Sequence, residues 1–159
     1  MIFLSRFSSD SSQSTGLQFV RVYNVWHTLV KDALAKIGLT HPQYIFLAAT
    51  GYLAQFHECV TQKMISDTSS IDPMTVSQLA RLLENKNFIK RLPHPTDTRA
   101  KSIVLESAAC DLLKTATPIV EDIDNQFFGQ LGEKESDFRQ ICHTLLSRSL
   151  APIPPDRIR

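Results

Sequence analysis

Polar side chains that can hydrogen-bond to base edges and phosphates share one face of a helix predicted to open at Asp72-Pro73. Asp72 suits the N-cap, and Pro73 suits the first helical position, where no backbone N–H is needed. Apolar residues recur at i, i+3, i+4 and i+7 on the side that faces the core, namely Val76, Leu79, Ala80 and Leu83. The opposite side is uncharged or basic and carries Met74, Thr75, Ser77, Gln78, Arg81 and Asn85. A solvated face without a ligand is the alternative interpretation of this pattern.

Positive charge is concentrated around the same helix. From Asp72 to Lys101 there are six basic and three acidic residues, a local charge of +3, whereas the whole chain carries only +1. Neutralisation of phosphates requires such a concentration. The residues predicted to contact phosphates are Lys63, Lys86, Lys90, Arg91 and Lys101.

The neighbouring segments predict the elements that position this helix. Thr61 suits an N-cap for a short preceding helix, and residues 67–70 are of types that end it. Asn87 suits a left-handed residue after the main helix. Strand-forming residues then occupy 88–92 and 102–105, and the turn-rich segment 93–99 separates them. This order predicts a winged helix-turn-helix.

Four motifs in this order resemble the MarR family of regulators. They are Leu39-Thr40-His41-Pro42-Gln43, Asp72-Pro73-Met74-Thr75-Val76-Ser77, the stretch from Leu82 to Arg91, and Asp97-Thr98-Arg99-Ala100. The resemblance extends from about Gly16 to Leu150. Two departures are Asn87 in place of the usual glycine and Glu106-Ser107-Ala108-Ala109 in place of the usual helix opening. Both concern helix ends and not the positions that would face DNA.

The resemblance implies a homodimer that regulates transcription, as a repressor, on a pseudo-palindromic operator of double-stranded DNA. Half-sites of helix-turn-helix dimers lie about 10 bp apart. On matching positions the family assigns the major groove to Thr75, Ser77, Gln78 and Arg81, of which Gln78 suits adenine and Arg81 suits guanine or a phosphate. Arg99 matches the arginine at the wing tip that enters the minor groove, and Asp97 matches the acid that orients it.

The expected fold class is mainly α (α+β), with about six helices and a wing sheet of two or three strands. Segment 17–37 has two apolar stripes, which indicates a second subunit against one of them. In the family, helices corresponding to 16–38 and 107–150 form the dimerisation region, and 40–105 corresponds to the DNA-binding lobe. Residues 1–15 are predicted to be a mobile arm and 151–159 a tail. Pro118 predicts a kink or break near Thr117.

Small aromatic acids bind many members of this family between the dimerisation helices and the DNA-binding lobe. Trp26, His27, Tyr44 and Phe56 occupy suitable segments for such an effector, although each also suits the core. Among the cysteines, Cys59 lies beside His57 and suits either a reactive thiol or a buried position, whereas Cys110 and Cys142 are predicted in the core. No spacing of histidines and cysteines predicts a metal site.

Composition and motifs weigh against other classes of function. The sequence has no nucleophile elbow, phosphate-binding glycine loop or paired helical histidines, so no enzyme activity and no cofactor are predicted. No apolar run approaches the length of a bilayer span, and the three widely spaced cysteines suit a reducing compartment. A cytoplasmic, nucleoid-associated protein is therefore expected. The alternative is a winged-helix module that binds protein without specific DNA binding, but such a module does not need the local charge of +3.

Overall fold

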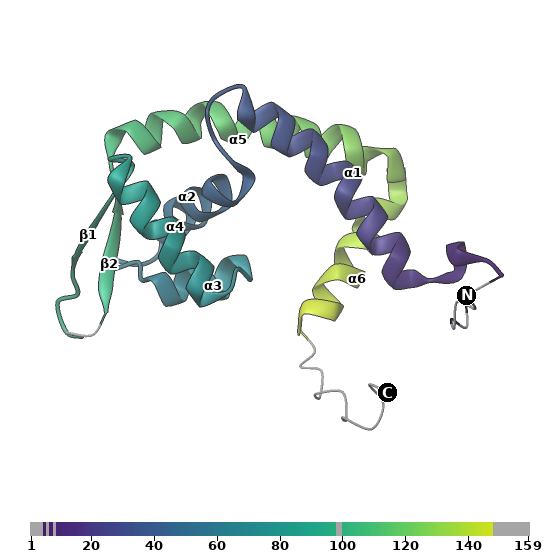
Figure 1. The fold of residues 1–159 in the computed structure, drawn as a ribbon, viewed down its shortest axis with the longest axis horizontal. Helices are drawn as coiled ribbons and strands as arrows, with labels where there is room; N and C mark the ends of the chain where they lie inside the picture. Colours follow the sequence, from purple (N-terminus) through teal and green to yellow (C-terminus); the bar gives the residue numbers. More distant parts are fainter. Residues whose placement is uncertain (1–4, 6, 8, 98–99, 148–159) are drawn as a thin grey trace. The chain divides into compact units, whose positions relative to one another are not determined.

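The computed structural model describes residues 5, 7, 9–97 and 100–147. It is mainly helical, with one two-stranded antiparallel sheet, as predicted (Figure 1). The elements are η1 (Ser11–Gln13), α1 (Thr15–Ala35), α2 (His41–Leu53), α3 (Gln62–Ser69), α4 (Pro73–Asn85), β1 (Ile89–Pro93), β2 (Lys101–Leu105), α5 (Ser107–Phe128), η2 (Gly129–Lys134) and α6 (Glu135–Ser147). The chain divides into two compact units, residues 1–123 and 124–159.

Local sequence signals define most helix ends in the first unit. Thr40 and Gln43 form a capping box at the start of α2. Helix α1 ends with Gly38 at φ +73°, where the N–H of Gly38 bonds to the Ala35 carbonyl and that of Leu39 to the Leu34 carbonyl. This pair of bonds is a Schellman motif, and the left-handed backbone at its end suits glycine.

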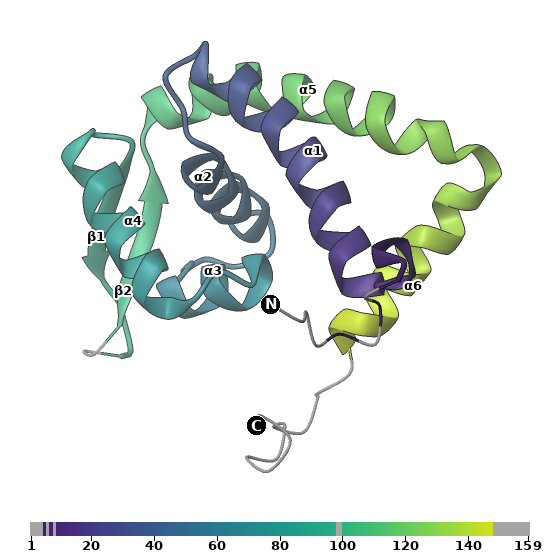
Figure 2. The same cartoon turned by 45° about the vertical axis from the view of Figure 1, so that its right-hand side comes forward.

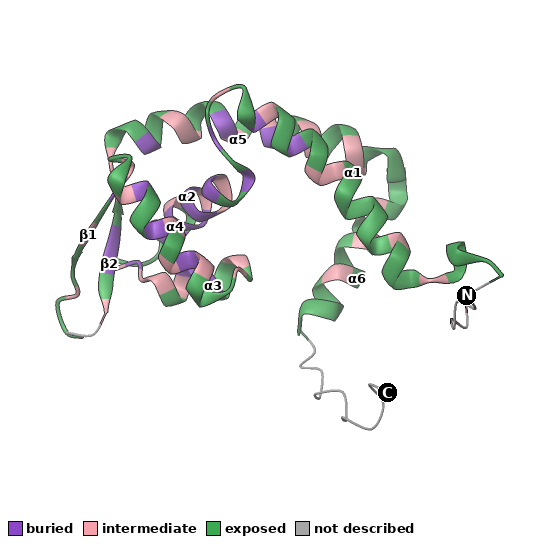
Figure 3. Ribbon diagram, viewed as in Figure 1, coloured by how far each residue is buried: buried purple, intermediate pink, exposed green. Residues whose placement is uncertain are grey.

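The core of the first unit joins the C-terminal part of α1 to the three following helices and the hairpin. Phe46 and Leu47 of α2 are fully buried, and so are Ile65 of α3 and Leu83 of α4. Figures 1 and 2 show α2 beside α3 and α4, with the hairpin along one edge of this lobe next to α4. Figure 3 shows the buried residues concentrated within these elements. The core therefore fixes α4 and the hairpin in one body.

Only the C-terminal part of α1 is covered by its own chain. Val30 and Leu34 are buried, whereas most apolar residues further toward the N-terminus are exposed. Phe19 is 62% exposed and Val25 57% exposed. The predicted second stripe is thus an open apolar surface within the described part of the chain, and it is formed by Phe19, Val22, Val25 and Leu29.

The structure corrects the expected position of Cys110 and excludes a break near Thr117, whereas a kink there stays a prediction. The helix runs from Ser107 to Phe128 without a break, although Pro118 lies inside it. Burial of Ala116 and Val120 on either side of the proline holds this part of the helix against the core. Cys110 is exposed and does not belong to the core, because it lies about 100° around α5 from the buried Ala109. Cys59 and Cys142 are half-buried.

The second unit contains the end of α5, η2 and α6. Gly132 adopts φ +56° where the chain turns, and α6 begins at Glu135. The rings of Phe128 and Phe138 stack with their centroids 5.8 Å apart. Helix α6 leaves Ile141, Leu145 and Leu146 exposed.

The terminal segments are only partly described. Residues Ser11–Gln13 form a short 3-10 helix that is capped by Asp10, within the segment predicted to be an arm. The predicted tail, 151–159, lies outside the described residues. Within the described residues, none of the helices has the length and apolar character required to cross a bilayer.

Candidate nucleic-acid interface

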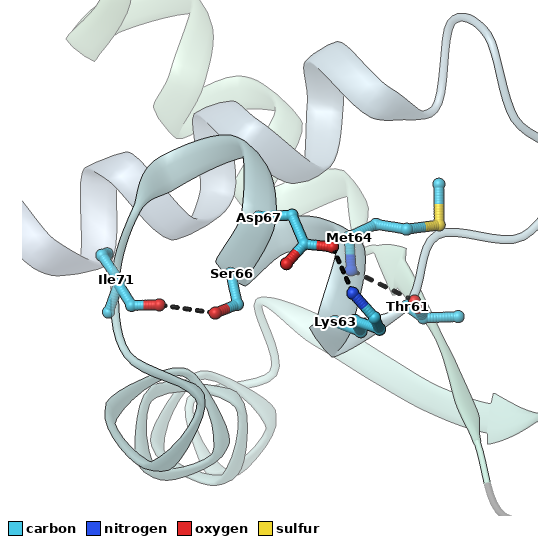
Figure 4. Close-up of polar contacts among 6 residues, drawn as sticks. All are labelled: Thr61, Lys63, Met64, Ser66, Asp67 and Ile71. Atoms are coloured by element: carbon cyan, nitrogen blue, oxygen red, sulfur yellow. Dashed lines mark hydrogen bonds and ion pairs between the residues drawn. The ribbon is translucent and has the colours of Figure 1, made fainter. Parts of the chain in front are cut away.

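Helix α3 and the turn after it fix the start of the candidate recognition helix α4. Thr61 is the predicted N-cap of α3, and its hydroxyl accepts from the Met64 N–H at 3.3 Å. The Ser66 hydroxyl donates to the Ile71 carbonyl at 2.6 Å, as Figure 4 shows. Ser66 is buried, and Ser70 turns the chain with a left-handed backbone at φ +57°. These bonds set the angle between α3 and α4.

Helix α4 has the two faces that the sequence predicts. The Asp72 side chain caps it by accepting from the Thr75 N–H at 2.9 Å, and the bonds to Thr75 lower the pKa of this carboxyl. Val76, Ala80 and Leu83 are fully buried, and Leu79 is half-buried. On the other side Gln78 and Arg81 are exposed, Thr75 and Ser77 are half-buried, and Met74 is 72% exposed.

A hydrogen-bonded turn leads from α4 into the hairpin. Asn87 takes φ +57°, as predicted for a residue that replaces glycine there. Its N–H bonds to the Glu84 carbonyl, and the Phe88 N–H bonds to the Leu83 carbonyl, both at 2.9 Å. Strand β1 therefore starts in a fixed direction relative to α4.

The hairpin pairs β1 with β2 in an antiparallel register that aligns Ile89 with Leu105 and Pro93 with Lys101. Pro93 thus lies at the end of the strand and not in the predicted tip. On the other side of the hairpin, β2 meets a third backbone segment through a single bridge between Thr61 and Ser102. The Ile103 N–H also donates to the Val60 carbonyl at 2.7 Å. The expected sheet of two or three strands is therefore two strands plus this bridge.

At the tip, His94 has a role that sequence reasoning did not assign. Its Nδ1 accepts from the N–H groups of Thr96, at 3.3 Å, and Asp97, at 3.1 Å. The sequence signal that could have indicated this role is the position of His94 between two prolines near the tip. Asp97 is exposed, whereas Arg99 lies outside the described residues, so the predicted pairing of these two side chains is not observed either way.

The predicted phosphate contacts differ in their surroundings. Lys63 pairs with Asp67 at 2.6 Å, as Figure 4 shows, and Lys90 pairs with Glu106 at 2.8 Å. Arg91 is half-buried and binds Glu84. Of the basic residues assigned to contacts with DNA, three exposed ones form no ion pair within the described part of the chain, namely Arg81, Lys86 and Lys101.

Two hollows border these residues. One, of about 330 Å³, lies between the start of α2 and the outer side of α4 and includes Thr75 and Gln78. The other, of about 400 Å³, lies between the start of α3 and the hairpin and includes Lys63, Asp97 and Lys101. Two of the predicted major-groove residues and two of the predicted phosphate contacts therefore line recesses on the surface of this lobe, namely Thr75, Gln78, Lys63 and Lys101.

Of the four residues predicted for an effector, Trp26 and His27 meet at the ring of His41. His27 of α1 lies with its Nδ1 2.8 Å from Nδ1 of His41 on α2, and the ring of Trp26 meets that of His41 edge-on. Phe56 is 66% exposed and contacts Tyr52 instead. Tyr44 is half-buried against the core.

His41 was not singled out by sequence reasoning, and it is the center of the small cluster. Its side chain is buried, and this burial, followed by the nearby His27, lowers its pKa from 6.5 to about 4. Its position in a motif that opens α2 gave no indication of a partner fourteen residues earlier in the chain.

Another hollow lies elsewhere in the first unit. It has a volume of about 850 Å³, and its walls come from α2, β2 and α5, including Gly51, Leu105 and Leu113. A Cβ on Gly51 would approach the side chains of Leu105 and Leu113 to 3.5 and 3.6 Å, so the glycine keeps the floor of this hollow open. His57, Glu58 and Lys114 supply charged or polar groups at its edge. Among the described residues, no cluster of three or more histidine, cysteine or acidic side chains has the arrangement of a metal site.

Comparison with known proteins identifies the family. A family model described as MarR family matches residues 52–101. An HTH-type transcriptional regulator of Bacillus subtilis, YdcH, is 36% identical over 132 residues, which covers 83% of this chain and 89% of YdcH. The chain belongs to the MarR family. It is therefore related to transcriptional regulators, and the predicted assignment is confirmed.

Solved structures confirm the winged-helix fold of this MarR-family chain. BpsR of Bordetella bronchiseptica, whose DNA binding is regulated by 6-hydroxynicotinic acid, superposes with a TM-score of 0.78 at 18% identity, covering 87% of this chain and 97% of BpsR. A mutant MarR from E. coli in complex with operator DNA gives a TM-score of 0.75 at 18% identity, covering 91% and 99%.

Proposed function

We propose that this protein is a sequence-specific double-stranded-DNA-binding repressor that acts as a homodimer on a pseudo-palindromic operator. The observation that supports it is helix α4, which buries Val76, Ala80 and Leu83 and leaves Gln78 and Arg81 exposed. A helix fixed in this way, with a hairpin beside it, can enter a major groove while the hairpin follows the flanking backbone.

The roles follow from the chemistry of the exposed groups. Gln78 suits a bidentate contact to adenine, and Arg81 suits guanine or a phosphate, with Thr75 and Ser77 beside them. Arg99 would enter the minor groove, oriented by Asp97. Phosphate contacts come from Lys63, Lys86, Lys90 and Lys101, which are all exposed. In a dimer these four lysines can neutralise eight phosphates.

The dimer is supported by the open apolar surface of α1. Phe19, Val25 and Leu29 are between 47% and 62% exposed, and together with Val22 they form one stripe along the helix. Contiguous apolar surfaces of this kind mark interfaces between proteins. A second copy of the chain is the occupant that a twofold operator requires. We assign 16–38 and 107–150 to the dimerisation region and 40–105 to the DNA-binding lobe.

Control by a small aromatic effector is the remaining part of the proposal. The 850 Å³ hollow between α2, β2 and α5 lies within the size range of small-molecule sites. BpsR, which shares the fold, is regulated by an aromatic acid. An effector would shift the affinity for DNA by the difference between its affinities for the two conformations, and by no more. Such a regulator would act in the cytoplasm, on the nucleoid.

Gel-shift titration on random-sequence duplexes at two salt concentrations tests the DNA-binding proposal. With eight phosphates neutralised, we expect affinity to fall by about 10³- to 10⁵-fold between about 50 and about 200 mM salt. A winged-helix module that binds protein, the alternative function, would show no complex even at the lower salt concentration.

A further inference from the structure

We propose that Glu84 and Arg91 are positioning residues: their ion pair sets the angle of the wing relative to the recognition helix, and Arg91 does not contact the DNA backbone. This inference rests on the proposed DNA-binding function and changes the role predicted for Arg91 from its charge alone.

The two side chains are joined by several hydrogen bonds. Glu84 Oε2 accepts from Nε of Arg91 at 2.7 Å and also from Nη2 of the same guanidinium. Its other oxygen, Oε1, accepts from the backbone N–H of Arg91 at 3.3 Å. One carboxylate at the end of α4 therefore holds both the side chain and the main chain of β1. The Glu84 carboxylate thus occupies the Nε and Nη2 edge of the guanidinium.

Strand geometry explains why Arg91 faces the helix. Successive side chains of a strand point to opposite faces, so Arg91 shares a face with Ile89, which is 1% exposed and belongs to the core. Lys90 points the other way and reaches Glu106 at 2.8 Å. Arg91 thus continues the core-facing row of β1 at the position where apolar packing ends.

The pair connects β1 to α4 at the level where β2 is fixed to the segment before α3, because Arg91 and Leu92 pair with Ile103 and Ser102. The start of β1 is fixed by the turn at Asn87, and β2 is fixed by Val60 and Thr61. Beyond Arg91, Leu92 and Pro93 are exposed. Among the described residues, the Glu84–Arg91 pair is the outermost hydrogen-bonded connection between α4 and β1. Its loss would free β1 from α4 at Arg91, while the turn at Asn87 and the attachment of β2 through Ser102 and Ile103 remain.

Electrostatics support the same role. Glu84 is the acid on a helix that would approach phosphates, where an unpaired carboxylate would be repelled. The hydrogen bonds from Arg91 lower the pKa of the Glu84 carboxyl, so it stays ionised and paired at neutral pH. The two opposite charges offset each other, which weakens the attraction of Arg91 for a phosphate.

Two measurements on the full-length protein test this role, with Glu84→Gln and Arg91→Met as variants. In hydrogen exchange without DNA, the amides of the outer hairpin should exchange about threefold to tenfold faster in both variants. The hydrogen bonds of a partly exposed ion pair stabilise a structure by an amount that corresponds to a factor of this size. In DNA titrations, the probes are a duplex selected from a random-sequence pool and an unselected random-sequence duplex. Both variants should lower the ratio of the two affinities by a similar factor, and the slope of log affinity against log salt should stay unchanged.

Glu106→Gln is the matched control, because it makes the same change of carboxylate to amide in the ion pair on the opposite face of β1. It should leave the exchange of the outer hairpin and the affinity ratio unchanged. The double variant of Glu84 and Arg91 should resemble either single variant, because the two side chains act as one unit.

Two results would overturn the inference. The first combines two observations: the salt slope of Arg91→Met falls by about 0.9 for each phosphate no longer neutralised, and Glu84→Gln binds DNA more tightly than the wild type. Arg91 would then be a phosphate ligand that Glu84 masks. The second is unchanged hairpin exchange in Glu84→Gln. Failure of the wild-type protein to bind either duplex would instead refute the proposed function, and hydrogen exchange would still decide the structural role of the pair.

Discussion

Acidification should weaken this fold through His41. The imidazole is 5% exposed, its pKa is lowered from 6.5 to about 4, and its Nδ1 lies 2.8 Å from that of His27. When both rings are neutral, the Nδ1–H of one ring can donate to the Nδ1 lone pair of the other. Two imidazolium rings would instead repel each other. Between pH 6.5 and about pH 4, His41 therefore becomes protonated in the unfolded chain but stays neutral in the folded chain.

The sign and the size follow from linkage. Because the folded-state pKa lies below the unfolded one, the contribution of His41 to stability is intact above about pH 6.5, declines as the pH falls, and reaches its full loss below about pH 4. The interval between 6.5 and about 4 corresponds to about 3 kcal/mol in total. Between pH 7 and pH 5 the expected loss is about 2 kcal/mol per subunit.

Urea unfolding at a series of pH values, at one protein concentration, measures this loss. The control is His41→Gln, whose amide can still bond to His27 but does not titrate. The other histidines and the acids are common to both proteins, so the difference between the two pH profiles isolates His41. The reasoning is refuted if the variant loses as much stability between pH 7 and pH 5 as the wild type does.

Three further predictions concern DNA, folding and assembly. Arg99→Ala should weaken binding to a selected duplex and reduce the salt slope by about 0.9 for each phosphate that the variant no longer neutralises, as measured by fluorescence anisotropy; an unchanged affinity would exclude a role for Arg99 in binding. Ser66→Ala should destabilise the protein by about 1–2 kcal/mol in urea unfolding, because the Ile71 carbonyl loses its 2.6 Å bond; stability equal to the wild type would show that water replaces the hydroxyl. Val25→Glu should shift the protein to monomers in analytical ultracentrifugation, because it places a charge in the apolar stripe of α1. Lys31→Glu, at an exposed residue outside that stripe, should leave the dimer intact, and a monomeric wild-type protein would contradict the dimer.

Local signals predicted the helix ends because the residues that make them are neighbours in the sequence. Thr61 and Asp72 cap α3 and α4, and Asn87 takes the left-handed backbone that the turn requires. Each of these bonds spans only a few residues, so residue type and spacing are sufficient to predict it. The buried face of α4 followed from helical periodicity for the same reason.

Tertiary contacts could not be predicted in this way. The pairing of His27 with His41 joins two helices, and the pairing of Glu84 with Arg91 crosses a turn between a helix and a strand. Charge alone made Arg91 a phosphate contact, because the sequence does not reveal which side of β1 faces α4. Cys110 was expected in the core for a similar reason, since α5 has more apolar residues than its own unit covers.

Pro118 shows how packing can overrule a local preference. Proline removes one backbone hydrogen bond and predicts an interruption, yet α5 is continuous from Ser107 to Phe128. Ala116 and Val120 are buried on either side of it, and the carbonyl that loses its partner belongs to Lys114, whose side chain is 76% exposed. Water can therefore replace the missing bond at little cost.

The central claim is that the outer side of α4 reads bases in a DNA groove. It is tested most directly by titrating Gln78→Ala and Lys86→Ala against a selected duplex and against duplexes that each carry one changed base pair. We expect Gln78→Ala to lose discrimination at one base pair of each half-site by roughly 1–3 kcal/mol, and Lys86→Ala to weaken binding to every duplex by the same factor. The same uniform loss for both variants on all duplexes would contradict the claim.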